Sequence, residues 1–222
     1  MKAIYLVPLV AMAVVGCGGS DQVSENRTRG AADVVITWPE RTRLIPNASE
    51  SIVITISAGD QELVRRVVAR PVVGNTVRVA FQDLPATDLT LKAEAFPSDD
   101  GSGVAQASAA EIIRIVADQT TQASITMEST IVRIDIAPAN PTLAVGNAVN
   151  LTATAKNVGG QTVVIGANTT TWSSSNPAVA TVDQNGQVIA IAEGTTTITF
   201  RESESNVSGQ VTVTVVSDTE TP

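Results

Sequence analysis

Short runs of alternating apolar and polar residues, separated by turn-forming residues, constrain the fold of this 222-residue chain more than any other feature. Ser51–Ser57 (SIVITIS) and Gln210–Val216 (QVTVTVV) are the clearest runs. Successive side chains of a strand point to opposite faces, so each run offers one apolar face to a core. Valine and threonine favour strands, and aromatic residues make up only 3% of the chain. The sequence predicts an all-β fold.

Seven such runs lie in the first half of the chain, between residues 33 and 128. They are Val34–Trp38, Ser51–Ser57, Leu63–Ala69, Thr76–Phe81, Leu89–Phe96, Val104–Val116 and Gln122–Met127. Short strands at this spacing, with turn residues between them, predict two packed sheets. Residues 33–128 are therefore expected to form a β-sandwich. Within them, Phe81–Phe96 resembles a run found in transthyretin-like and related surface sandwiches, although Thr87 and Asp88 replace its usual glycine.

The second half carries more specific motifs. They are Leu143–Gly146, Trp172–Pro177, Val179–Val182, Asn185–Gly186, Ile189–Gly194 and Val211–Val215. In this order they resemble the group 2 bacterial immunoglobulin-like domain, which implies a second tandem Ig-like sandwich over residues 129–217, with 218–222 as a polar tail. The chain departs from that family's pattern at Gly159–Ala167 and Arg201–Asn206. Asn185–Gly186, between two alternating runs, predicts a type I′ hairpin.

The first residues have the pattern of a secretory signal. Met1 and Lys2 are followed by the uncharged run Ala3–Val15, which would span roughly 20 Å as a helix and is too short to cross a bilayer. Val14–Cys17 resembles the bacterial lipobox, which implies removal of residues 1–16 and attachment of a diacylglycerol to Cys17. A multiply acylated cysteine would anchor the chain to a membrane. The alternative is an ordinary signal peptide whose cysteine is incidental.

A polar segment follows the predicted anchor. Residues 17–32 show no apolar periodicity, so they are expected to form a flexible tether, with a sorting or partner-binding segment as the alternative. Gly18 stands where enterobacterial lipoproteins retained in the inner membrane have an aspartate. The resemblance therefore implies the bacterial cell envelope, with the outer membrane or cell surface favoured over the inner membrane.

Two tryptophans and two acidic turns are candidate binding residues. Trp172 and Trp38 could stack on a sugar ring, but a lone tryptophan in a strand is more often a core residue. Asp183–Gly186 is faintly similar to a calcium loop but lacks the other ligands, so a turn is favoured. Asp99–Asp100 could hold a cation or form a solvated turn. We predict no metal site.

A cluster of basic residues marks one strand of the first half. Arg65, Arg66 and Arg70 fall in or beside a single predicted strand. Charged side chains protect exposed sheet edges from pairing with other chains. We therefore expect this strand to lie at a sheet edge.

Composition narrows the classes of function. The chain has no histidine, its only cysteine is assigned to lipid, and its carboxylates are scattered, which predicts neither an enzyme nor a cofactor. A net charge of −8 disfavours nucleic acid. The leading hypothesis is a lipid-anchored envelope protein for adhesion, binding or spacing, with an unknown protein or envelope polysaccharide as partner. The alternative is a carbohydrate-binding or enzyme-accessory module, against which the few aromatic residues weigh.

Overall fold

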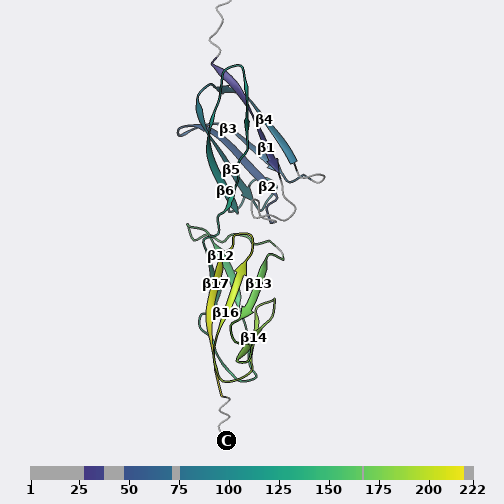
Figure 1. The fold of residues 1–222 in the computed structure, drawn as a ribbon, viewed down its shortest axis with the longest axis vertical. Helices are drawn as coiled ribbons and strands as arrows, with labels where there is room; N and C mark the ends of the chain where they lie inside the picture. Colours follow the sequence, from purple (N-terminus) through teal and green to yellow (C-terminus); the bar gives the residue numbers. More distant parts are fainter. Residues whose placement is uncertain (1–27, 38–47, 72–75, 167, 218–222) are drawn as a thin grey trace, which may run out of the picture.

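The computed structural model describes residues 28–37, 48–71, 76–166 and 168–217, and every regular element in these ranges is a strand. The all-β class expected from the sequence is confirmed. The strands form two domains stacked end to end (Figure 1). Within the described ranges, no helix has the length and apolarity needed to span a membrane.

The first domain consists of a five-stranded and a three-stranded sheet. The larger sheet has the order β3 (Gln61–Ala69), β2 (Ser51–Ala58), β5 (Asp88–Phe96), β6 (Ala107–Arg114) and β8 (Glu128–Ser129), all antiparallel. The smaller sheet has the order β4 (Thr76–Pro85), β1 (Arg29–Thr37) and β7 (Thr120–Ala123), with β7 parallel to β1. Because β6 and β7 follow each other along the chain but lie in different sheets, their connection joins the two layers.

The alternating pattern of β2 places its isoleucines in the core. Ile52, Ile54 and Ile56 are fully buried between the sheets. Val53 points to the opposite face and is also buried, because Gly101 in the β5–β6 connection lies against it. The larger sheet is therefore covered on both faces at this point, by the second sheet on one side and by a loop on the other.

Strand β1 begins at Arg29, inside the segment expected to be a tether. Ala31 and Ala32 are buried, and Gly30 approaches the Val116 carbonyl so closely that a Cβ atom at Gly30 would clash with it. The segment shows no apolar periodicity, but its small residues permit close packing. The tether prediction is wrong for residues 29–32, and residues 1–27 lie outside the described residues.

The second domain is built from three sheets, of four, three and two strands. One has the order β10 (Thr142–Ala144), β17 (Ser208–Val216), β16 (Gly194–Glu202) and β13 (Thr170–Ser174), with β10 parallel to β17. Another has the antiparallel order β11 (Ala148–Asn150), β15 (Gln187–Ala190) and β14 (Ala180–Val182), and β12 (Thr152–Lys156) pairs with β9 (Arg133–Ala137). A second apolar core lies between these sheets.

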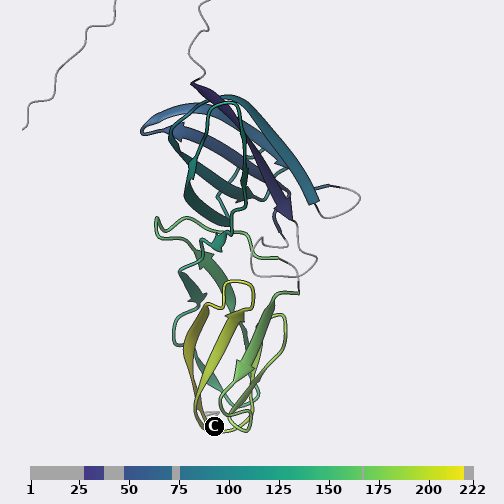
Figure 2. The ribbon, with the colours of Figure 1, turned by 45° about the horizontal axis from the view of Figure 1, so that its top comes forward.

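The described chain runs from one end of an elongated body to the other. Strand β1 begins at the end of the first domain that points away from the second, and β17 ends at the far end of the second domain (Figures 1 and 2). We call these ends the N-terminal pole and the C-terminal pole. The domain junction lies midway between them.

Candidate functional site at the domain junction

Two residues singled out in the sequence, Cys17 and Trp38, lie outside the described residues. Lipid attachment at Cys17 therefore stays a prediction, and so does the place of Trp38 in the core.

Trp172 lies in the second core, as predicted. Its side chain is 8% exposed, and its ring meets that of Phe200 edge to face with the centroids 4.8 Å apart. The two rings come from neighbouring strands, since Trp172 of β13 pairs directly with Phe200 of β16. Edge-to-face contacts of this kind add to the stabilisation from burial. The indole is therefore not available as a platform for a sugar.

The turn at Asp183–Gly186 joins β14 to β15, but it is not the predicted type I′ turn. That type needs positive φ at both central residues, whereas in this turn only Gly186 has positive φ, at 83°. Instead, the Gly186 amide donates to the Asp183 carbonyl, and the Asp183 carboxylate accepts from the Asn185 and Gln187 amides at 2.9 and 2.8 Å. The Gln187 amide, followed by the Asn185 groups, lowers the pKa of Asp183. Aspartate first and glycine fourth suit a type I turn.

The other charged candidates also have structural roles. The Asp100 carboxylate accepts a 2.9 Å bond from the Ser102 amide, and hydrogen bonds from the Ser102 side chain and backbone lower the pKa of Asp100. Arg65 and Arg66 are exposed on β3, which is the edge strand of the larger sheet. Among the described residues, no group of three or more acidic, histidine or cysteine side chains could hold a metal ion.

Gln106 connects the two domains through a fully buried side chain. Its Nε2 donates a 2.8 Å hydrogen bond to the Val164 carbonyl of the second domain, and its Oε1 accepts a 2.8 Å bond from the Ser49 hydroxyl of the first. Ser49 and Gln106 are both 0% exposed. Buried polar groups are costly when unpaired, so a side chain that satisfies one on each domain favours a single arrangement of the two.

Apolar and backbone contacts reinforce this bridge. Val104, from the β5–β6 connection of the first domain, packs against the core of the second. The Thr130 hydroxyl donates a 2.6 Å bond to the Ala105 carbonyl, and the Thr130 amide donates a 3.0 Å bond to the Gln106 carbonyl. The chain that passes between the domains is thus bonded to the same loop that carries Gln106. The domains abut instead of hanging on a free linker.

A groove of about 490 Å³ opens beside this contact, with walls from both domains. The residues that shape it include Glu94 and Phe96 of β5, Ser108 of β6, Thr130 at the crossing, and Asn157 and Gln161 of the second domain. Its lining is therefore mixed, with hydroxyl, amide and carboxylate groups beside an aromatic ring.

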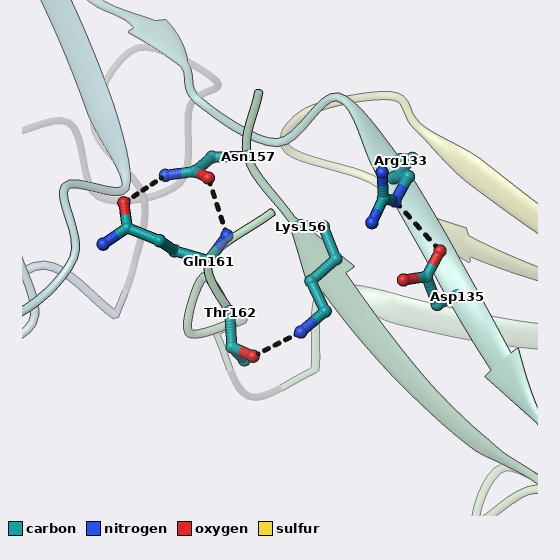
Figure 3. Close-up of polar contacts among 6 residues, drawn as sticks. All are labelled: Arg133, Asp135, Lys156, Asn157, Gln161 and Thr162. Atoms are coloured by element: carbon teal, nitrogen blue, oxygen red, sulfur yellow. Dashed lines mark hydrogen bonds and ion pairs between the residues drawn. The ribbon is translucent and has the colours of Figure 1, made fainter. Parts of the chain in front are cut away.

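The loop after β12 forms the second-domain wall of the groove. The Asn157 carboxamide is bonded twice to Gln161: Oδ1 accepts from the Gln161 amide at 2.9 Å, and Nδ2 donates to Gln161 Oε1 at 3.1 Å (Figure 3). On the adjoining surface, Lys156 Nζ donates to the Thr162 hydroxyl at 2.8 Å. Arg133 on β9 pairs with Asp135 at 3.1 Å. The bonds of Asn157 and Lys156 hold the loop in shape, and the ion pair on β9 neutralises the charge of Arg133, whereas Lys156 keeps its charge because its partner is a neutral hydroxyl.

The groove was not predicted from the sequence, although one signal pointed to it. Gly159–Ala167, where the chain departs from the group 2 pattern, contributes both Gln161 in the groove wall and the Val164 carbonyl bound by Gln106. Gln106 itself carries no local signal, because its partners lie far away in the sequence. Chemically, these groups suit hydrogen bonding to a polar ligand.

Residues 130–215 match the family model of the bacterial Ig-like domain, group 2. The second domain is therefore a bacterial Ig-like domain, as its motifs predicted. The match does not extend to the first domain, for which the transthyretin-like resemblance stays a prediction. No curated protein matches the chain.

Several solved structures are similar at low identity. Domains 4 and 5 of the S-layer protein SbsC are 16% identical, with 61% of this chain and 68% of that chain covered and a TM-score of 0.34. A C-terminal 282-residue fragment of intimin, in complex with the intimin-binding domain of its translocated receptor, is 20% identical. There, 77% of this chain but only 53% of that chain is covered, with a TM-score of 0.34.

Proposed function

We propose that this protein is a lipid-anchored bacterial cell-envelope protein whose domains serve non-catalytic adhesion, binding or spacing outside the membrane. The observation that carries the proposal is a bacterial Ig-like domain joined end to end to a second sandwich, with a closely bonded junction between them. Such a body holds its two poles apart and presents loops, where binding residues are commonly found.

The N-terminal motif supports attachment to a membrane. Val14–Cys17 follows an apolar run of signal-peptide length, and β1 begins shortly after it at Arg29. Lipid on Cys17 would direct the N-terminal pole toward the membrane. The C-terminal pole would then point away from it, toward the outer surface of the cell or another layer of the envelope.

The side-chain chemistry supports a non-catalytic role. Histidine is absent from the sequence, and its only thiol is the proposed lipid carrier. Acid–base or nucleophilic catalysis requires a reactive group within hydrogen-bond reach of a partner that activates it. Purified protein should therefore not turn over glycoside, peptide or ester substrates. Turnover that is abolished by changing one carboxylate would contradict this part of the proposal.

The anchor is tested by mass spectrometry of the protein produced in a bacterial host. We expect a mature chain that begins at Cys17 and carries acyl mass, and we expect Cys17→Ser to release the protein from membranes. Ser20→Ala, three residues away, is the matched control and should remain membrane-bound. An intact signal segment, or a mature start at another residue, would refute lipid anchoring.

The binding role is tested by crosslinking on intact cells, followed by capture with the full chain. We expect a partner outside the membrane, either a protein or an envelope polysaccharide. Deleting residues 130–217 should abolish capture if the Ig-like domain makes the contact. Partners found only in the cytoplasm would contradict the proposed location.

A further inference from the structure

We propose that the groove at the domain junction binds a neutral oligosaccharide. The inference rests on the proposed function, because it names a ligand class and a site for the binding role. The volume of the groove, about 490 Å³, lies within the 300–1,000 Å³ typical of sites for small ligands. A folded protein partner would instead need a surface of about 800 Å² on each side. The groove is therefore suited to a few units of a polymer chain.

The polar groups of the groove can both donate and accept hydrogen bonds. Gln161 Oε1 already accepts from Asn157, whereas within the described chain the Gln161 Nε2 hydrogens have no protein acceptor. The Ser129 hydroxyl accepts from the Ile131 amide at 3.2 Å, so its own hydrogen can be donated. The Thr130 hydroxyl donates to Ala105 and keeps its lone pairs. Sugar hydroxyls are both donors and acceptors, and such a set matches them.

Apolar side chains lie beside these polar groups. Phe96 is half-buried in the groove, Val132 is 56% exposed, and Val158 at the tip of the loop after β12 is 93% exposed. Ligand sites characteristically combine apolar and aromatic walls with a few oriented polar groups. The C–H face of a sugar ring would cover this apolar surface while its hydroxyls reach Ser129, Thr130 and the amides.

The charge of the groove selects against an ionic ligand. Glu94 is the lone ionisable side chain among its described lining residues, and Lys92 Nζ lies 2.9 Å from its carboxylate. A polyanion would thus meet a carboxylate and no unpaired cation in the lining. A polycation would compete with Lys92 for a single paired charge. The charges of the groove therefore complement neither a polyanion nor a polycation, and they favour a neutral ligand.

Calorimetric titration of the full-length protein in detergent tests the proposal. The probes are cellohexaose, laminarihexaose and mannohexaose, with hexagalacturonate as the anionic comparison. We expect at least one neutral probe to bind more tightly than the anion. The affinity of the Asn157→Ala/Gln161→Ala double variant for this probe should fall about tenfold. Each lost hydrogen bond to a neutral group lowers the affinity by up to a few-fold, and two such bonds are removed. Gln210→Ala, an exposed glutamine on β17 outside the groove, is the matched control and should bind as the unmodified chain does.

A second measurement does not depend on the variants folding. Amide chemical shifts of the unmodified chain, titrated with the tightest neutral probe, should change at Glu94, Ser108, Ser129 and the loop after β12. Absence of binding to all three neutral probes, shifts confined to another surface, or tighter binding of hexagalacturonate would each overturn the proposal. Membrane release by Cys17→Ser is independent of these results, so failure of the sugar site and failure of the anchor are distinguishable.

Discussion

The two domains reach a packed β core by different routes. In the first domain most strands have eight to ten residues and pair over long ladders, as in β2 and β4, and among the described residues the buried core is aliphatic apart from Phe81 and Met127. In the second domain most strands have three to five residues, as in β11 and β13, and the core is centred on the edge-to-face pair of Trp172 and Phe200.

This difference determines which core substitutions should destabilise each domain most. Apolar stabilisation in the first domain is spread over many similar side chains, so the loss of one methyl group leaves the others in place. In the second domain the Trp172 indole packs edge to face on Phe200 of β16 and lies close to Gly186 in the turn between β14 and β15. Its removal cannot be compensated by neighbours without leaving a cavity.

Trp172→Ala should have the largest effect. We expect the second domain to lose about 3–5 kcal/mol of unfolding free energy, because the side chain is buried and its ring contact with Phe200 is lost. Denaturant unfolding gives the magnitude, and hydrogen exchange followed by mass spectrometry assigns the loss to residues 130–217. Trp172→Phe, which keeps an aromatic ring, should lose less. An effect near zero would mean that the core does not depend on this pair.

Gln106→Ala should have the second largest effect on stability, and it should also change how the two domains are aligned. Loss of the amide leaves the Ser49 hydroxyl and Val164 carbonyl without their partner, at a cost of about 1–3 kcal/mol. Residual dipolar couplings should show that the domains no longer share one alignment. Gln82→Ala, an exposed position on β4, is the control and should change neither quantity. A variant with unchanged alignment would show that Val104 and Thr130 suffice to hold the junction.

Ile54→Val tests the distributed core of the first domain. Removing one methylene from this fully buried residue should cost about 0.5–1.5 kcal/mol. Scanning calorimetry should show a shift of several degrees in the transition of the first domain, with the second domain unchanged. A loss as large as that of Trp172→Ala would remove the contrast between the two cores.

The sequence predicted what depends on short-range pattern. Period-two alternation identified the buried isoleucines of β2, and a lone tryptophan in a strand was correctly placed in the core. A turn at Asp183–Gly186 is confirmed, but the type I′ geometry predicted from Asn185–Gly186 is wrong, because the Asp183 carboxylate accepts from the Asn185 and Gln187 amides and directs the turn. The start of β1 at Arg29 has no apolar periodicity to indicate it, because Gly30, Ala31 and Ala32 pack through their small size.

The junction could not be predicted in the same way. Gln106 bonds to Ser49 and Val164, which lie more than fifty residues away in either direction. No periodicity near residue 106 reports such contacts, since they depend on how two finished domains meet. The departure from the family pattern at Gly159–Ala167 marked the region as unusual, but only the fold shows that it forms one wall of the groove.

The smallest expected effect is a difference between the domains in their response to acid. The pKa values of Asp183 in the second domain and Asp100 in the first are both lowered by hydrogen bonds to the carboxylate. A lowered pKa in the folded state contributes stability above the unfolded value near 4, and that stability is lost as the pH falls through the folded pKa. Asp183 accepts from the backbone amides of Asn185 and Gln187 and from the Asn185 side chain, whereas the bonds that lower the pKa of Asp100 come chiefly from the side chain and backbone of the single residue Ser102. Between pH 6 and pH 3 the unfolding temperature of the second domain should therefore respond more to Asp183→Asn than that of the first does to Asp100→Asn.

Asparagine can still accept these bonds but cannot ionise, so each variant should flatten the pH profile of its own domain while preserving the turn. Equal pH profiles for Asp183→Asn and the unmodified chain would show that the carboxylate at this turn contributes nothing through its charge.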